Sequence, residues 1–438
     1  MRTKTDIGEK IIFVCVFLLF GTIFLQAQHT LSLDECIAIA RKNSLVLRIS
    51  ATTIRSTHSA QDELKTTALP HLKLGAGALY APWSKNFGYD PALSNGGQLA
   101  RQMILQQPLY DAGIRRLKSM QLDLELTRLS NERYANERDI IFGVKEAFIE
   151  LLFAQEATSL QQSSAEQLAK YLDLVNRIYH GGNGSYTDVL KTGVQLASAS
   201  IAVERAKESQ DIAKLSLAQA MGIPADTSLI ASGTHEHLSI STADSLSTIM
   251  SDSIFTNLDL QTAQIEIEKG LVEIELAQSE RLPSILLNAD AGLLSSFDNL
   301  HLPLDNRASM IGASIGISIE FPLLTWGTID LRTEQRRLAI EVQRDQKELL
   351  RRSIVTERQK TLLQLRTALN RLDALKQNVH MAEDNYSLTK SKYAAGGSLA
   401  LEVLSAQQLL VDTRTASLQT ESDLCLLLAH LEQITTRQ

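Results

Sequence analysis

Two hydrophobic patterns occur along the chain, and each predicts a different kind of element. From Met310 to Glu320, apolar residues take every second position and small or polar residues fill the positions between them. This period of two is typical of a β-strand with one apolar face. From Thr328 to Tyr393, apolar residues follow a 3/4 spacing that predicts a helix with a heptad seam. The clearest part of the seam is Leu365, Ala368, Leu372, Leu375, Val379, Ala382, Tyr386, Thr389 and Tyr393.

Proline and glycine mark where these two elements end. Pro322 has no N–H to donate, so we expect the strand to end at this residue. Gly396 and Gly397 follow the helical pattern and favour its termination. A helix from Thr328 to Tyr393 would extend roughly 100 Å at 1.5 Å per residue. We therefore expect this helix to project beyond the part of the molecule that contains the strand.

The same succession of motifs occurs twice, which predicts an internal duplication. A Leu-Pro pair, a Pro-Leu-x-x-x-Gly motif and a glycine-rich segment follow one another in each half of the chain. Equivalent residues are Pro70 and Pro283, 213 residues apart; Pro108 and Pro322, 214 apart; and Tyr179 and Tyr393, also 214 apart. The near-constant offset is not expected from unrelated helices.

Each repeat is predicted to contain a helix, two strands, a long helix and a shorter returning helix. The first helix begins after Ser32, which forms a capping-box pattern with Glu35, and continues to about Thr67. Its counterpart is expected from about Ser245 to Glu280. The strands are expected near residues 72–80, 98–107, 285–293 and 308–321, and in the second of them Arg101 and Gln102 place a polar residue on each face. The predicted divisions are a signal peptide at 1–27, a first repeat at 28–222, a linker at 223–243 and a second repeat at 244–438.

Composition and charge narrow the classes of protein that fit. The first residues carry Arg2, Lys4 and Lys10 before an apolar run, which predicts a secretory signal peptide. Beyond that run no segment approaches the ~18 apolar residues of a membrane helix, so any membrane insertion must use a barrel. The formal net charge of -7 argues against a nucleic-acid partner. Cys36 and Cys425 are interpreted either as a disulfide or as plain core residues.

No catalytic or metal-binding constellation is predicted, so we expect neither enzymatic activity nor a cofactor. The glycines from Gly181 to Gly184 lack the lysine and spacing of a phosphate-binding loop and are interpreted as a turn between helices. The acids Asp188 and Glu402 then lie in the first turn of the following helices, where the helix dipole favours them. The segment from Thr234 to His237 contains two histidines but no third ligand, so no metal site is expected.

Aromatic residues lie close to the predicted strand ends. In barrels that cross a membrane, such rings form girdles at the two interfaces, although packing against helices is an alternative. The candidate interface residues are Tyr80, Trp83, Tyr110, Phe321 and Trp326. Four strands cannot close a barrel and lipid does not tolerate open sheet edges, so several chains must share one; three chains would supply twelve strands.

These motifs, in this order and in duplicate, resemble the outer membrane efflux protein family of TolC-like channels. The residues that carry the resemblance are Leu31 to Ile37, the two Leu-Pro pairs, Gln107 to Gly113, Thr187 to Leu190 and Leu401 to Leu404. The resemblance implies a mainly helical fold with a β-barrel portion: a homotrimer with a twelve-stranded barrel in the outer membrane and a coiled-coil α-barrel across the periplasm. The implied function is the exit duct of a tripartite efflux or type I secretion system, with a periplasmic adaptor and an inner-membrane transporter as partners.

In that family the two glycine-rich turns form the periplasmic tip, where the pore closes and the adaptor docks. The residues that the resemblance assigns to the tip are Tyr179, Gly181, Gly182, Asn183, Asp188, Tyr393, Ala395, Gly396, Gly397 and Glu402. Ser398 replaces an arginine that can link the turns in other members, and Ser405 replaces a second acidic residue. Two alternatives stay open at this stage: a structural coiled-coil protein that spans the periplasm, and a periplasmic adaptor without a conduit.

Overall fold

The computed structural model describes residues 30–81, 96–225, 228–232, 257–297 and 309–435. The predicted signal peptide and most of the predicted linker lie outside these residues. In the described part of the chain, no helix combines the length and the hydropathy needed to cross a membrane.

The chain forms two compact units. The strand-bearing unit comprises the described residues within Ile49–Tyr134 and Leu258–Arg352. The helical unit comprises those within Met1–Arg48, Ala135–Asn257 and Ser353–Gln438. Each unit therefore takes elements from both predicted repeats, and the boundaries of the repeats remain a prediction.

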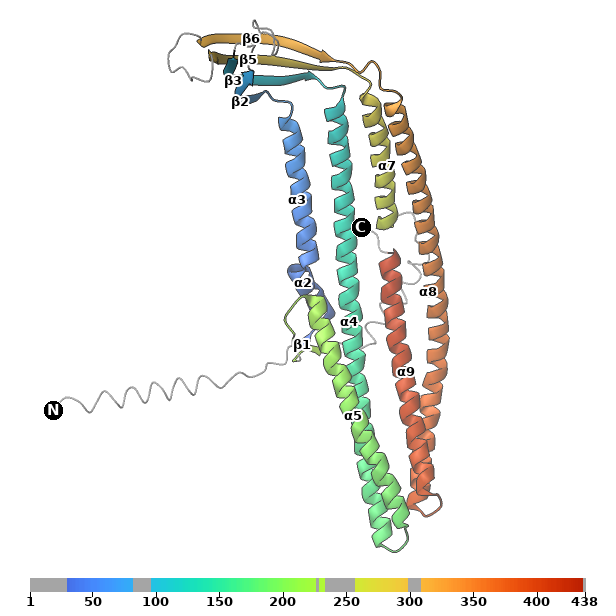
Figure 1. Ribbon diagram of the computed structural model, residues 1–438. Helices are drawn as coiled ribbons and strands as arrows, with labels where there is room; N and C mark the ends of the chain where they lie inside the picture. The colour runs from blue at the N-terminus through green and yellow to red at the C-terminus, as the bar shows by residue number, and fades with distance from the viewer. Residues whose placement is uncertain (1–29, 82–95, 226–227, 233–256, 298–308, 436–438) are drawn as a thin grey trace, which may run out of the picture. The chain divides into compact units, whose positions relative to one another are not determined.

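The strand-bearing unit contains a sheet and the helices that enter and leave it (Figure 1). Two of these helices, α4 and α8, continue into the helical unit. In chain order the elements are α3 (Leu45–Thr66), β2 (His71–Ala81), β3 (Gly96–Tyr110), α4 (Ile114–His180), α7 (Leu258–Ser279), β5 (Ser284–Phe297), β6 (Ser309–Glu320) and α8 (Thr328–Ala394).

The described residues form one four-stranded sheet, in the order β2-β3-β5-β6, and every pair of neighbours is antiparallel. Paired residues share a face, so the register separates two sets of side chains. The apolar face contains Leu72, Leu74, Ala76, Ala78, Leu99, Met103, Leu105, Ile285, Leu287, Ala289, Ala291, Leu293, Ile311, Ala313, Ile315, Ile317 and Ile319. The polar face contains His71, Lys73, Gln102, Gln106, Asn288, Asp290, Ser314, Ser318 and Glu320. The alternation expected from the sequence is thus clear on β2, β5 and β6, whereas β3 also places Arg101 and Gln107 on the apolar face and Ile104 on the polar face.

Strand β3 is longer than predicted, because it does not end at Gln107 but continues through Pro108 to Tyr110. The ladder with β2 stops at Gln106, so Pro108 has a paired strand on only one side. A proline is tolerated at such a position, and the register with β5 shifts between Pro108 and Tyr110. Pro322, by contrast, follows the end of β6 at Glu320, as the sequence predicts.

The described part of the helical unit contains two long hairpins, the short helix α2 (Leu33–Asn43) and a small parallel β-pair. In the first hairpin α4 is followed by α5 (Tyr186–Met221), and in the second α8 is followed by α9 (Ala400–Thr435). Helices α4 and α8 have 67 residues each, and α5 and α9 have 36 each. The β-pair joins β1 (Thr30–Leu31) to β4 (Ile230–Ala231).

The opening helix was expected to continue unbroken to Thr67, and this expectation is wrong. Helix α2 (Leu33–Asn43) ends before Ser44, and α3 begins after it. The Ser44 N–H donates to the Ala40 carbonyl, and the Ser44 hydroxyl accepts from the Leu47 N–H at 3.2 Å, so one serine ends one helix and caps the next. The predicted capping box of Ser32 and Glu35 is present. The described part of its counterpart, α7, spans Leu258–Ser279.

The predicted heptad seam of α8 faces the interior, since all nine of its residues are buried or half-buried. Leu365 packs with Leu424 and Leu428 of α9, so the seam joins the two helices of the second hairpin. Cys36 and Cys425 are free thiols buried in separate apolar clusters. Burial raises the pKa of both thiols to about 11, as expected for plain core residues.

Candidate functional site

The two glycine-rich turns have the same backbone geometry. Gly182 follows α4 with φ +80°, and Gly396 follows α8 with φ +78°. In the first turn, the Gly182 N–H donates to Tyr179 and the Asn183 N–H to Ile178; in the second, Gly396 donates to Tyr393 and Gly397 to Lys392. This pair of bonds is the Schellman motif, in which a left-handed residue satisfies the last helical carbonyls. The interpretation as helix-ending turns is confirmed.

The carboxylates after these turns contribute to the start of the returning helices. The Glu402 carboxylate accepts hydrogen bonds from the Ser398 hydroxyl and, at 3.3 Å, from the Leu399 N–H. The Ser398 bond, followed by the Leu399 bond, holds the pKa of Glu402 below its ordinary value. Asp188 lies in the first turn of α5 and is half-buried, and its backbone carbonyl accepts from the Thr192 hydroxyl at 2.8 Å. Ser398 thus bonds to a residue of its own hairpin. The longer arginine side chain found here in other family members could extend to the other turn.

A cluster of tyrosines joins the two hairpins near these turns. Tyr171 of α4 is fully buried, and its ring meets that of Tyr393 edge-on, with 5.5 Å between centroids. The Tyr171 hydroxyl donates to the Ala400 carbonyl at 3.4 Å, and the neighbouring Tyr386 hydroxyl is buried without a hydrogen-bond partner among the described residues. Burial first, and then the neighbouring Tyr393 and Asp188, raise the pKa of Tyr171 far above its ordinary value. Sequence reasoning missed Tyr171, although it lies in the helical pattern of α4.

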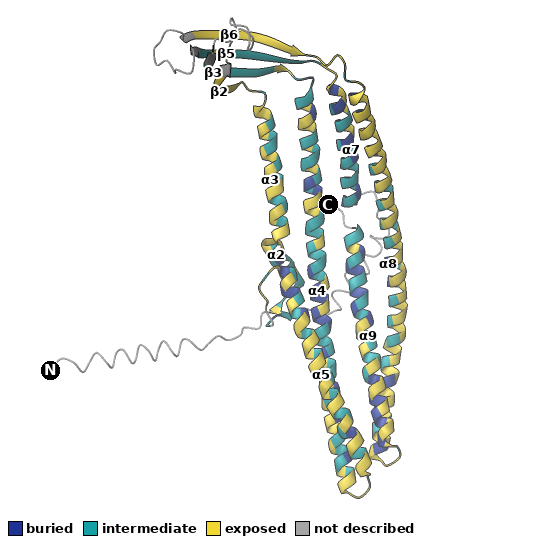
Figure 2. Cartoon of the chain, viewed as in Figure 1, coloured by how far each residue is buried: buried dark blue, intermediate teal, exposed yellow. Residues whose placement is uncertain are grey.

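The structure divides the predicted tip residues into surface and core. Gly181, Gly182, Asn183, Ala395, Gly396, Gly397 and Glu402 are exposed, and the ends of both hairpins are largely yellow in Figure 2. Tyr179 and Tyr393 occupy equivalent positions but differ in environment. Tyr179 is 37% exposed and stacks at an angle on Tyr186, whereas Tyr393 is 7% exposed and packs against Tyr171. Only the first of them can contribute to a surface.

An exposed apolar stripe on α5 begins beside the first turn. Tyr186, Leu190 and Val194 are each more than half exposed, and Ile201 continues the row. Their spacing of four, four and seven residues places them on one helical face. A stripe of this kind is typical of a helix that packs against another helix. The apolar residues at these positions were visible in the sequence, but only the structure shows that no described part of the chain covers them.

The junctions between strands and long helices contain the second group of predicted site residues. Each strand exit has two consecutive left-handed residues, Ala112 and Gly113 after β3, and Trp326 and Gly327 after β6. Trp326 is 86% exposed, and Tyr110 and Phe321 are also exposed. The side chain of Tyr80 and the whole of Trp83 lie outside the described residues. A bulky residue with positive φ and an exposed ring is unusual and indicates a role outside the chain's own core.

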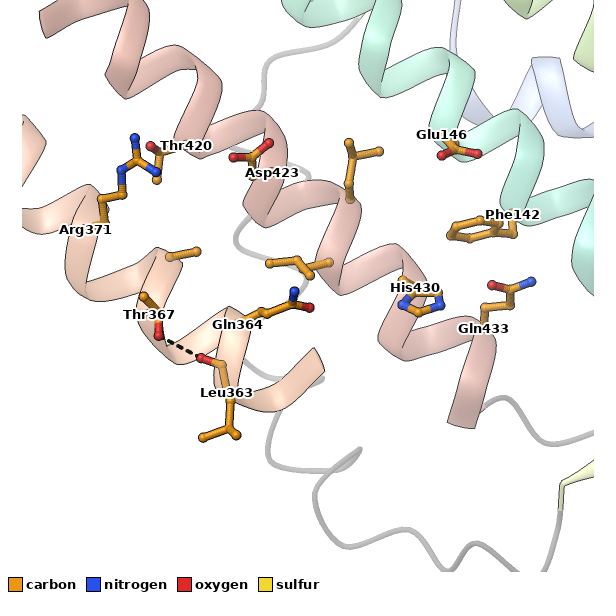
Figure 3. Close-up of a pocket in the computed structure, with 13 residues that line it drawn as sticks. Phe142, Glu146, Leu363, Gln364, Thr367, Arg371, Thr420, Asp423, His430 and Gln433 are labelled. Atoms are coloured by element: carbon orange, nitrogen blue, oxygen red, sulfur yellow. Dashed lines mark hydrogen bonds between the residues drawn. The ribbon is translucent and has the colours of Figure 1, made fainter. Parts of the chain in front are cut away.

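A groove of about 800 Å³ lies in the helical unit, away from the turns (Figure 3). Phe142 and Glu146 of α4, Arg371 of α8 and His430 of α9 line it, and the rings of Phe142 and His430 are 5.9 Å apart. Among the residues that the structure describes, no three acidic, histidine or cysteine side chains are grouped to hold a metal ion. The segment from Thr234 to His237 lies outside them.

Comparison with known proteins identifies a family with this combination of a sheet, paired helical hairpins and repeated turns. The sequence profile of the outer membrane efflux protein family matches residues 36–223 and 250–436, most of the chain. The chain belongs to the outer membrane efflux protein family. It is therefore located in the outer membrane with a periplasmic extension, and it acts as an exit duct of the efflux and secretion type. This function replaces the two alternatives, a structural coiled coil and an adaptor.

Individual relatives are distant but cover most of the chain. The outer membrane protein TolC of Salmonella enteritidis is 22% identical over 380 residues, which are 86% of this chain and 76% of that protein. The proteases secretion protein PrtF of Dickeya chrysanthemi is 24% identical over 358 residues, 78% of this chain and 74% of PrtF. Among solved structures, the outer membrane protein VceC of Vibrio cholerae has a TM-score of 0.73 at 18% identity, covering 92% of this chain and 96% of VceC. The VceC structure therefore shares the fold of this chain.

Proposed function

We propose that three copies of this chain close a twelve-stranded barrel in the outer membrane and continue as a helical duct in the periplasm. The observation that carries the proposal is the sheet with two open edges, β2 and β6, and one apolar face. Lipid cannot satisfy the backbone groups of an open edge, and four strands are too few to enclose a lumen. Because β2 and β6 run in opposite directions, β6 of one copy can pair antiparallel with β2 of the next.

The two faces of the sheet support this arrangement. The apolar face suits lipid, and the polar face suits a water-filled lumen. On the polar face a row of hydrogen bonds crosses the sheet from Lys73 to Gln106 and Asn288, and on to Ser318. A polar row of this kind remains hydrated if it lines a channel. In contact with lipid, these polar groups would lose their hydration, and this loss costs free energy.

Disulfide trapping across the edges tests the assembly. Gly77 of β2 and Gly312 and Gly316 of β6 lie on the polar face, and a Cβ at any of them meets nothing within 4 Å. Gly77→Cys, combined in turn with Gly312→Cys and Gly316→Cys, should give covalent ladders that stop at three chains. Within one chain β2 and β6 are three strand spacings apart, about 14 Å, which is too far for a disulfide. Single-cysteine variants are the controls, and ladders that pass three chains, or none from either pair, would refute the trimer.

We further propose that the two turns form the periplasmic tip, where an adaptor docks and the pore narrows. The exposed stripe of Tyr186, Leu190 and Val194 supports a helical partner at this place. In this arrangement three copies each of Asp188 and Glu402 surround the exit path, and their negative charge favours cations. The adaptor then connects the duct to an inner-membrane transporter.

A further inference from the structure

The apolar face of the sheet carries a single charged side chain among the residues that the structure describes. Arg101 of β3 is paired with Ala76 of β2 and with Leu293 of β5, and both partners belong to the apolar face. The alternation of β3 therefore places Arg101 on that face with Met103 and Leu105. The other charged strand residues, His71, Lys73, Asp290 and Glu320, lie on the polar face.

The residues that the structure describes offer Arg101 little to bind. The side chain is exposed, and in the described part of the protein no carboxylate forms an ion pair with it. Its neighbours across the strands include Ala76, Ala78 and Ala291, which are small and leave space around the guanidinium. Guanidinium groups on apolar surfaces normally have an anionic or hydrogen-bonding partner. The partner of Arg101 must therefore lie outside this sheet.

The position of Arg101 along the strand restricts what that partner can be. Eight ladder steps separate the pair of Tyr110 and Ile285, at the helix end, from the pair of Arg101 and Leu293 (293 − 285 = 8). Eight steps of about 3.4 Å on a strand tilted by about 40° rise roughly 21 Å. The apolar band of an outer-membrane barrel is about 25 Å tall. Arg101 thus lies at the edge of the band far from the helices, where an arginine costs little, and not at its centre.

We propose that Arg101 binds a phosphate on the headgroup of a lipid in the outer leaflet. The helices extend into the periplasm, so the far edge of the band faces the outer leaflet. A guanidinium donates two parallel hydrogen bonds to a phosphate, and this geometry favours phosphate over uncharged headgroups. The apolar residues beside Arg101 contact the acyl chains of the same lipid. This inference rests on the proposed barrel, in which the apolar face meets lipid.

Lipid retention by the purified full-length channel tests the proposal. The probes are lipid A with two phosphates, the same lipid A after removal of its phosphates, and inorganic phosphate as a competitor at equal phosphate concentration. Native mass spectrometry counts the lipids that each trimer retains. We expect the wild type to retain the phosphorylated lipid at least tenfold more tightly, Arg101→Gln to lose this preference and Arg101→Lys to keep part of it. Lys73→Gln, on the opposite face of the sheet, is the matched control and should behave as the wild type.

The outcomes separate this inference from the proposed assembly. A wild-type chain that forms no trimer overturns the assembly itself. A wild-type trimer that retains both forms of lipid A equally, or an Arg101→Gln trimer that keeps the preference, overturns the lipid site alone. Equal competition by inorganic phosphate would show that free anion, and not lipid, is bound. A loss of trimer from Arg101→Gln in lipid-free detergent would instead assign Arg101 to a contact between copies.

Discussion

The hydroxyl of Tyr171, on α4, donates a hydrogen bond to the backbone carbonyl of Ala400, the first residue of α9. One buried side chain thereby connects the first hairpin to the second, close to the turns that end α4 and α8. The contact is strengthened by the edge-on packing of the Tyr171 and Tyr393 rings, which adds about 1 kcal/mol beyond burial. Separation of the hairpins requires the loss of both interactions.

Substitution of Tyr171 should make the tip easier to open. Tyr171→Phe removes one buried hydrogen bond and should destabilise the contact by about 1 kcal/mol. Tyr171→Ala also removes the ring from a fully buried position, at a cost of about 3 to 5 kcal/mol. Single-channel conductance in planar bilayers should increase in the order wild type, Phe, Ala. The control is Tyr134→Phe, which changes an exposed tyrosine on the same helix. If Tyr171→Ala has the conductance of the wild type, Tyr171 does not contribute to the gate.

Alkaline pH should weaken the same contact. Burial raises the pKa of Tyr171, Tyr386 and Tyr393 in the folded protein, while an unfolded tyrosine titrates near pH 10. Their raised pKa values contribute stability that is fully present below about pH 10 and is lost as the pH rises further. Thermal unfolding midpoints measured from pH 8 to 11 should therefore fall more for the wild type than for Tyr171→Phe. Parallel curves for the two proteins would contradict this assignment.

The turns themselves can be tested without disturbing their backbone. Asparagine tolerates the left-handed conformation of Gly182 and Gly396, and a Cβ at either position meets nothing within 4 Å. If the turns dock an adaptor, Gly182→Asn and Gly396→Asn should reduce export severalfold with trimer levels unchanged. Gly327→Asn replaces a glycine of the same conformation just before α8, where a Cβ likewise meets nothing within 4 Å, and serves as the control. Normal export in both tip variants would leave these glycines with a helix-ending role alone.

Neutralisation of the tip carboxylates should reduce cation selectivity. The double variant Asp188→Asn and Glu402→Gln removes two negative charges per chain, and the reversal potential in a salt gradient should shift towards zero. Because the Ser398 bond lowers the pKa of Glu402, the carboxylate stays charged until the pH falls below its ordinary range near 4.5. Ser398→Ala should move the loss of selectivity to higher pH. Full selectivity in the double variant would show that these acids point away from the lumen.

The two faces of β6 should respond differently to charge. Ile315 lies on the apolar face and is 77% exposed, so Ile315→Arg should cost roughly 2 to 4 kcal/mol near the middle of the membrane and lower the yield of trimer. Ser314 lies on the polar face and hydrogen-bonds Asp290, so Ser314→Arg places a cation beside a carboxylate and should be tolerated. The amount of heat-stable trimer on gels measures the effect of each of the two substitutions. Equal losses would mean that the face assignment is wrong.

Local patterns were sufficient to predict the longest elements. The seam of α8 and the glycines after it predicted an end at Tyr393, one residue from the observed Ala394, because periodicity and a left-handed cap act locally. The sequence predicted that β3 ends before Pro108. The strand continues because Pro108 pairs with β5 alone, and the sequence does not show which edge of β3 has a neighbour at this position. Ser44 interrupts a helix without any proline or glycine to signal it. Tyr171 became visible as a linking residue only when two segments more than 200 residues apart were brought together.

The unequal surroundings of α3 and α7 carry a consequence for assembly. Helix α7 contacts α4 through Lys269 and Glu125, and α8 through Gly270 and Ile340, whereas its counterpart α3 has no buried residue. Duplication gives α3 and α7 the same place in their repeats. Under the proposed threefold closure, α3 should therefore pack against α8 of an adjacent copy much as α7 packs against α4, the long helix of the preceding repeat. The contact between α4 and α7 within one chain thus predicts the geometry of the contact between neighbouring subunits.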